Sequence, residues 1–173
     1  MSTVQEDAKN VIQELSKLKY DKGAMSILRK GLSDALEFKT YKYISRMCNI
    51  ENTRMRTIVK HIAAFYATHP ENVCGKNFGQ SIRELALKKD PKNGIETFER
   101  YINRILGSKD SISLCSYLSF LIRMIKSYGI PVDYETLYTD IVYWGDRTKI
   151  KWACAYQTGS DKEVSDVSDK NNS

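Results

Sequence analysis

Residues 110–144 read DSISLCSYLSFLIRMIKSYGIPVDYETLYTDIVYW, and the fold is organised around this stretch. Apolar residues in its first half recur at three- and four-residue steps, which places them on one face of a helix. Asp110 is suited to cap the start of this helix, because its carboxylate can accept a hydrogen bond from a first-turn amide. Gly129 followed by Pro131 ends it. The apolar stripe consists of Leu114, Leu118, Leu121, Ile122 and Ile125.

A second helix is predicted to begin at Asp133, again a good N-cap residue, and to end at Gly145. Its residues Leu137, Ile141 and Trp144 are expected to face inward. The two helices would form a hairpin with an apolar, aromatic-rich inner surface. Other helices must cover that surface to keep it from water.

Helical patterns also occur outside the hairpin. Thr3 with Glu6 matches a capping box, and Asn52 and Asn77 are suited to cap further helices. No segment shows strand-like alternation of useful length, and no internal repeat is present. The sequence therefore predicts an all-α protein of about eight helices, with more than half of its residues helical and no sheet. The helices would form one bundle or two small bundles packed together.

Three parts are expected along the chain. Residues 1–107 are predicted to form an N-terminal helical bundle, and residues 108–156 the hairpin with a last helix packed on it. In that last helix Ile150 and Trp152 are expected to face inward, and Trp152, like Trp144 in the hairpin, to be largely buried. Residues 157–173 are polar and rich in Ser and Asp, so they are predicted to be a disordered tail.

Composition narrows the class of protein. The chain has 173 residues, of which 42% are hydrophobic, but no run of about 18 apolar residues that would predict a membrane span. The first ten residues are polar and acidic, unlike a signal peptide. The four cysteines are widely scattered without a CxxC pair, so reduced cysteines are expected. We therefore expect a cytoplasmic protein without a metal or cofactor.

The charge of the chain is more informative. The net charge is +6, and because residues 157–173 hold four acids and two bases, the remaining 156 residues carry 25 bases against 17 acids. This excess of +8 indicates an acidic partner, most simply a nucleic-acid backbone. From composition alone, basic residues that merely solvate helix surfaces are an equal alternative.

A search for catalytic groups finds little. His61 and His69 are the only histidines, and their spacing matches no zinc pattern. Asp133 and Asp140 are seven residues apart and share a helix face, so they could hold Mg²⁺ or act in acid–base chemistry. Asp133 is better explained as an N-cap and Asp140 as the partner of a nearby base. The protein is therefore not expected to be an enzyme.

The basic residues are better functional candidates. Arg100 and Arg104 lie one helical turn apart, as do Arg147 and Lys151, so each pair can present cations to successive phosphates. The aromatic residues lie mostly on core stripes, which favours backbone contact over base stacking. The expected mode is recognition of shape and charge. The candidate nucleic-acid-binding residues are Arg29, Lys30, Arg54, Lys88, Lys89, Arg100, Arg104, Arg123, Lys126, Arg147, Lys149 and Lys151.

Short motifs follow one another in a characteristic order between residues 24 and 156. A Leu-Arg-Lys element occupies residues 28–30, and an Asn-x-Arg step at residues 52–54 opens a long helix. That helix ends with Ala-Thr-His-Pro at residues 67–70. The later motifs are Gly79 with Arg83, Arg100-Tyr101-Ile102, Val132-Asp133-Tyr134 with Leu137, Asp140 and Trp144, and Arg147 with Trp152-Ala153 and Tyr156.

This ordered set resembles the CasB family, the small subunit of Cascade, the type I-E CRISPR surveillance complex. The family's leucine-rich helix often carries LRRL, where this chain has Leu118-Ser119-Phe120-Leu121 and a basic residue, Arg123, one turn later. The resemblance implies an all-α subunit without catalytic activity, often present in more than one copy. It also implies contacts with the nucleic-acid backbone, with other Cascade subunits and with the DNA strand displaced by the guide RNA.

The leading hypothesis is a nucleic-acid-binding structural subunit that stabilises the R-loop. Its partners would be guide RNA, the target or displaced DNA strand, other Cascade subunits and further copies of itself. A sequence-blind basic surface suits this role, because the displaced strand differs for every guide. Two alternatives remain: an all-α adaptor that binds only protein, and a small helical hydrolase using Asp133 and Asp140.

Overall fold

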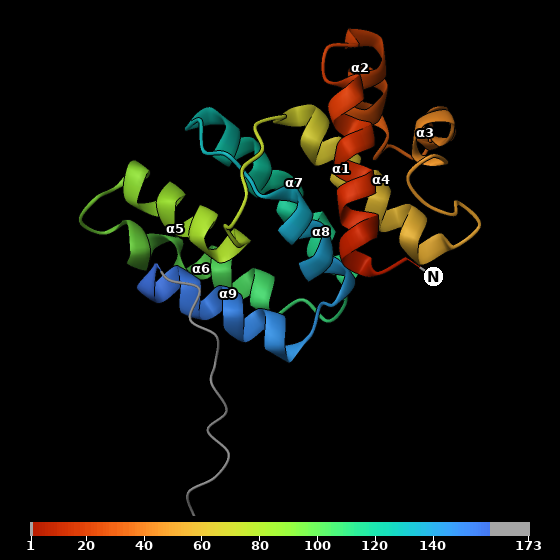
Figure 1. The fold of residues 1–173 in the computed structure, drawn as a ribbon. Coiled ribbons are helices and arrows are strands. Elements are labelled where there is room, and N and C mark those ends of the chain that lie inside the picture. The colour runs from red at the N-terminus through yellow and green to blue at the C-terminus, as the bar shows by residue number, and fades with distance from the viewer. Residues whose placement is uncertain (1, 160–173) are drawn as a thin grey trace, which may run out of the picture.

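The computed structural model describes residues 2–159. Nine α-helices make up 71% of these described residues, which confirms the all-α prediction (Figure 1). Within these residues the only β-type pairing is an isolated bridge between Asn72 and Val132. The helices are α1 (Val4–Leu18), α2 (Lys22–Lys30), α3 (Glu37–Ile44), α4 (Thr53–Thr68), α5 (Phe78–Lys89), α6 (Gly94–Leu106), α7 (Ser111–Ser127), α8 (Tyr134–Val142) and α9 (Asp146–Thr158).

Six of the nine helices in residues 2–159 start at a side-chain cap, and five of these caps are the ones that the sequence predicts. In each case the cap oxygen accepts a hydrogen bond from the amide three residues later, which satisfies one of the free first-turn donors. The caps are Thr3, Asn52, Asn77, Asp110 and Asp133. Asp21 caps α2 in the same way.

Helix α7 lies between two groups of helices (Figure 1). On one side it packs against α4 and α8, and these contact α1 and, through α4, also α2 and α3. On the other side it packs against α5 and α6, and both of these contact α9. Since α1 packs on α8 and α5 packs on α9, contacts join the segments before and after residue 107. The division into parts at that residue stays a prediction.

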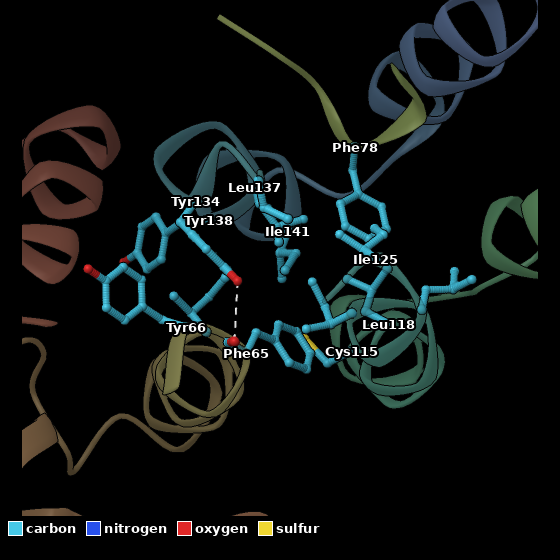
Figure 2. Close-up of a cluster of buried hydrophobic side chains, with 14 of the residues drawn as sticks. Phe65, Tyr66, Phe78, Cys115, Leu118, Ile125, Tyr134, Leu137, Tyr138 and Ile141 are labelled. Carbon is cyan, nitrogen blue, oxygen red and sulfur yellow. Dashed lines mark hydrogen bonds between the residues drawn. The ribbon is translucent and has the colours of Figure 1, made fainter. Parts of the chain in front are cut away.

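The core is rich in aromatic side chains, which meet where α4, α7 and α8 come together (Figure 2). The stripe predicted for α7 is buried throughout. Tyr134 at the start of α8 is fully buried, and its hydroxyl donates to the carbonyl oxygens of His69 at 2.6 Å and Phe65 at 3.2 Å. This hydroxyl therefore shares its proton between two carbonyl oxygens at the C-terminal end of α4, of which that of Phe65 also accepts the His69 amide at 2.9 Å.

One inward-facing prediction needs correction. Trp152 is buried as expected, and Trp144, which follows the end of α8, is partly buried against the core with its ring centroid 5.0 Å from that of Trp152 and its Nε1 donating to the Ser108 carbonyl at 3.0 Å. Ile150 is 48% exposed, so its predicted inward position is wrong. The buried residues of α9 are Thr148, Trp152, Ala155 and Tyr156, and at about 100° per residue Ile150 falls on the opposite side of the helix.

The C-terminal end of α9 is held by α5. Arg83 Nη1 donates to the carbonyl oxygens of Tyr156 and Gln157, both at 2.7 Å. Gly159 then takes a left-handed conformation, with φ of 74°, and its amide donates to the Ala155 carbonyl. The first two residues of the predicted tail thus belong to α9. The prediction of disorder for residues 160–173 falls outside the described residues.

Candidate nucleic-acid interface

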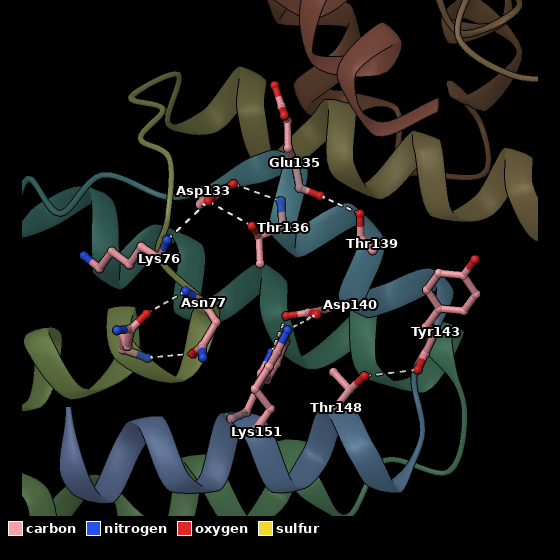
Figure 3. Close-up of polar contacts among 12 residues, drawn as sticks. Lys76, Asn77, Asp133, Glu135, Thr136, Thr139, Asp140, Tyr143, Thr148 and Lys151 are labelled. Atoms are coloured by element: carbon pink, nitrogen blue, oxygen red, sulfur yellow. Dashed lines mark hydrogen bonds and ion pairs between the residues drawn. The ribbon is translucent and has the colours of Figure 1, made fainter. Parts of the chain in front are cut away.

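The two aspartates of α8 have structural partners (Figure 3). Asp133 caps the helix through the Thr136 amide at 2.9 Å and accepts the Thr136 hydroxyl at 2.9 Å. Its second oxygen also accepts the Gly75 amide at 2.7 Å and the Lys76 amide at 3.3 Å. The carboxylate therefore fixes the segment that leads from α4 to α5 against the start of α8.

Asp140 is buried and faces α9. Its oxygens accept hydrogen bonds from Lys151 Nζ and from Trp152 Nε1, both at 2.6 Å. The expectation that Asp140 pairs with a nearby base is confirmed. Within residues 2–159 no group of three or more His, Cys, Asp and Glu side chains could hold a metal ion. The contacts of Asp140 join α8 to α9 across the middle of the molecule.

His61 is a part-buried residue of α4. Its Nδ1 lies 2.8 Å from the Thr57 carbonyl oxygen, and its ring meets the edge of Phe65 with centroids 6.0 Å apart. Burial lowers the pKa of His61, and the nearby Lys60 charge adds to this effect, while the Thr57 hydrogen bond opposes it. The side chain packs on its own helix, as expected for a structural histidine.

This lowered pKa predicts a pH dependence of stability. An unfolded histidine titrates near pH 6.5, so as pH falls through about 6.5 the unfolded chain takes up a proton before the folded chain does. Stability is therefore expected to fall on acidification from about pH 7.5 to about pH 5.5, and His61→Gln should reduce this fall. Urea unfolding at the two pH values measures it. Equal pH dependence in both proteins would show that His61 does not contribute.

Two of the twelve candidate basic residues are neutralised by carboxylates. Lys88 pairs with Glu84 at 3.2 Å, and Lys151 pairs with Asp140 at 2.6 Å. Burial would raise the pKa of Glu84, but the hydrogen bonds and charges of Lys76 and Lys88 outweigh it, and the pKa is lowered. Lys88 and Lys151 are thus less available to phosphates than the sequence suggests.

Two other candidates tie helices together. Arg29 Nε donates to the Ala67 carbonyl oxygen at 3.1 Å, which joins α2 to the end of α4. Arg54 Nη2 donates to the Val142 carbonyl at 2.7 Å and to the Ser111 hydroxyl at 3.2 Å, which joins α4 to α8 and α7. Part of each guanidinium is committed to these carbonyls. Both residues therefore have a structural role that the sequence does not reveal.

Arg100 and Arg104 lie on aromatic rings. The Arg100 guanidinium is 4.8 Å from the centre of the Tyr101 ring, and its Nη2 donates to the Tyr101 hydroxyl at 3.0 Å. Arg104 lies 4.6 Å from the centre of the Tyr117 ring. Tyr101 also stacks on Phe120 of α7, with centroids 6.0 Å apart and planes 27° apart. We call these five residues the arginine–aromatic face.

The other candidates have few contacts. Lys89 Nζ is 5.4 Å from the centre of the Phe98 ring, which itself contacts Tyr101, so this lysine lies beside the arginine–aromatic face. Lys149 belongs to α9, and its Nζ is 5.7 Å from the centre of the Trp144 ring. Within residues 2–159 the side chains of four candidates have no hydrogen bond, ion pair or cation–π contact: Lys30, Arg123, Lys126 and Arg147.

The structure thus places Lys89 and Arg100 on the Phe98 and Tyr101 rings, which contact each other, and Arg104 one turn further along α6, whereas Arg29 and Lys30 lie on α2 in the other group of helices. Against this background, a comparison with protein families matches residues 24–156 to the family described as CRISPR-associated protein Cse2. The chain belongs to this family. It is the CasB family of Cascade small subunits that the sequence motifs resemble, and other Cascade subunits are its partners.

Comparisons with curated proteins and with solved structures give no match. None of the helices in residues 2–159 has the length and apolar character needed to cross a membrane. The Cse2 family is one of structural Cascade subunits.

The sequence reasoning missed the aromatic half of the arginine–aromatic face. It assigned the aromatic residues to core stripes, but Phe120 of this Cse2-family chain is 47% exposed. A signal was present, because Phe120 does not belong to the stripe that includes Leu118, Leu121 and Ile122. Tyr101 likewise stands beside the stripe of α6 and is partly exposed.

Proposed function

We propose that this Cse2-family chain is a non-catalytic subunit that binds the nucleic-acid backbone and stabilises the R-loop of a CRISPR surveillance complex. The observation that carries the proposal is the pair Arg100 and Arg104. Both are exposed, neither has a carboxylate partner within residues 2–159, and the aromatic rings below them hold them in place. Phosphates can replace the solvent around such cations and release counterions.

The energetics of R-loop formation make such a surface useful. The RNA–DNA duplex that forms is about as stable as the DNA duplex that it replaces, so contacts with the displaced strand can shift the balance. Backbone contacts do this for any sequence. The proposed partners are therefore the displaced or target DNA strand and the guide RNA, together with further copies of the chain. The proposed setting is the cytoplasm.

A protein-only adaptor is the second candidate. Arginine and aromatic residues are also enriched at the energetic centres of protein interfaces, and the arginine–aromatic face has this composition. A hydrolase has less support, because Asp133 serves as a cap and Asp140 binds Lys151 and Trp152.

Replacing Arg100 and Arg104 together by Ala tests the proposal. We expect weaker binding of unrelated single-stranded DNA sequences by similar factors. Each lost phosphate contact should flatten the slope of log affinity against log salt by about 0.7–0.9. Fluorescence anisotropy at several salt concentrations with two oligonucleotides measures both quantities. In the assembled complex, the same variant should slow R-loop completion more than initial duplex binding, because the displaced strand exists only after unwinding.

The matched control is Lys9→Ala with Lys17→Ala. Both lysines are exposed on α1, so this variant loses the same charge from a surface outside the candidate set. It should keep nearly all of the affinity and slope. Equal behaviour of the two double variants, or no change in either, would refute a specific role for Arg100 and Arg104. Loss of binding to one oligonucleotide alone would mean that the contact reads bases.

A further inference from the structure

A ladder of three aromatic rings leads from the core to the surface. Phe98 of α6 is buried, with 1% exposure, and its ring contacts Tyr101 with centroids 5.2 Å apart. Tyr101 in turn stacks on Phe120 of α7, which is 47% exposed. Each inner ring supports the next, so Phe120 is held in one orientation although nearly half of it faces water. An immobilised exposed ring loses little side-chain entropy when another flat group stacks on it.

The ladder belongs to a regular arrangement along the α6–α7 hairpin. The contact of Arg104 with Tyr117 and the contact of Tyr101 with Phe120 keep the same antiparallel register, since each moves by three residues on both helices. A three-residue step is about 4.5 Å along a helix. Ring surfaces and guanidiniums therefore alternate at short intervals on this surface.

The charge around the rings is positive. Arg123 lies one turn beyond Phe120, and α7 contains no Asp or Glu from Ser111 to Ser127. On α6 the exposed Glu99 lies on the opposite flank from Tyr101, because each residue advances about 100° around the helix. Glu96 lies one turn before Arg100 but forms no ion pair with it. The surface therefore suits a partner with flat apolar groups and negative charges.

Single-stranded nucleic acid has this chemistry, because its bases are unpaired and phosphates follow one another along the chain. In a duplex the base faces are already stacked. We infer that the exposed face of Phe120, backed by Tyr101, is a stacking site for an unpaired base, while Arg100 and Arg104 contact the adjoining phosphates. The inference rests on the proposed function and deepens it, since it adds a preference for single strands over duplex.

The test compares wild type with Phe120→Ala and Phe120→Trp. The probes are a labelled oligothymidylate, an abasic strand of the same length, and a duplex. Stacking by one base predicts that Phe120→Ala weakens oligothymidylate binding about 5- to 150-fold and leaves abasic-strand and duplex binding nearly unchanged. Phe120→Trp should restore the binding, because it keeps an aromatic face. Melting curves check that both variants stay folded, as expected for a change at a half-exposed position.

The outcomes separate this inference from the proposed function. If Arg100→Ala with Arg104→Ala weakens every probe but Phe120→Ala weakens none, stacking at Phe120 is refuted and backbone binding stands. If wild type binds none of the probes, both are refuted. If Phe120→Ala impairs co-assembly with Cascade subunits while oligothymidylate affinity is unchanged, the face is a protein interface and the inference is wrong. Equal losses on the abasic and thymidylate strands would also contradict stacking.

Discussion

Replacing Gly79 by Ala is expected to lower the stability of the protein by about 1–3 kcal/mol, which is large for the addition of one methyl group. A Cβ at this position would lie 2.3 Å from the Trp152 carbonyl oxygen and 2.9 Å from the Trp152 Cα. Both are backbone atoms of α9, so neither can rotate away. Helices α5 and α9 would have to separate, which would disturb the contact between the Phe78 and Trp152 rings at 5.4 Å.

Thermal unfolding measures this effect, since 1 kcal/mol corresponds to about 2–4 °C in a protein of this size. The control is Gly23→Ala in α2, where the nearest atom to the new Cβ is Asp21 Oδ1 at 3.3 Å, the end of a side chain. This control should change stability by less than about 1 kcal/mol, because the higher helix propensity of Ala is set against a small shift of the Asp21 cap oxygen. Equal melting temperatures for Gly79→Ala and wild type would mean that α5 and α9 are not held this closely.

The second large effect is expected at Asp140. Asp140→Ala should cost about 3 kcal/mol, mainly because it leaves the Nε1–H of the fully buried Trp152 without its acceptor. The ion pair between Asp140 and Lys151 contributes less to this cost than the indole hydrogen bond does. The Lys151 side chain is 33% exposed and can turn toward water, so the pair is partly screened. Denaturant unfolding with a constant m-value would give the difference.

Lys151→Ala and Asp140→Asn are the informative comparisons. Lys151→Ala should cost less than Asp140→Ala, since it leaves the Trp152 hydrogen bond in place, although the buried Asp140 carboxylate loses the cation beside it. Asp140→Asn should fall between the two Ala variants, because its amide oxygen can still accept from the indole without a charge. If Lys151→Ala proves as costly as Asp140→Ala, the ion pair and not the indole contact dominates.

Much of this structure could be predicted from local sequence. The caps Asn52, Asn77, Asp110 and Asp133 act on amides three residues away, so the information that places them is short-range. The buried stripe of α7 follows in the same way from helical spacing. The motif order was also enough to indicate the family.

The rest depends on how the helices meet. Trp144 stands beyond the end of α8, and Ile150 faces outward because Trp152 takes the inward side of α9. The stacking of Phe120 on Tyr101 depends on how α6 and α7 are aligned, which helical spacing does not specify. The carbonyl contacts of Arg29 and Arg54 likewise join segments far apart in the chain. Side-chain exposure and contacts of this kind follow from the tertiary structure and not from local sequence.

The packing of α1 on α8 has a consequence for synthesis of the chain. The inner face of α1, with Val11 and Leu15, is fully buried in the finished protein, yet α8 begins only at Tyr134. At typical translation speeds α8 is made roughly 6–25 s after α1. During that interval α1 lacks its main native cover on the ribosome, since α4 contacts it less extensively than α8 does. We expect nascent chains that do not yet include α8 to expose the apolar face of α1, and we expect chaperones to bind these incomplete chains.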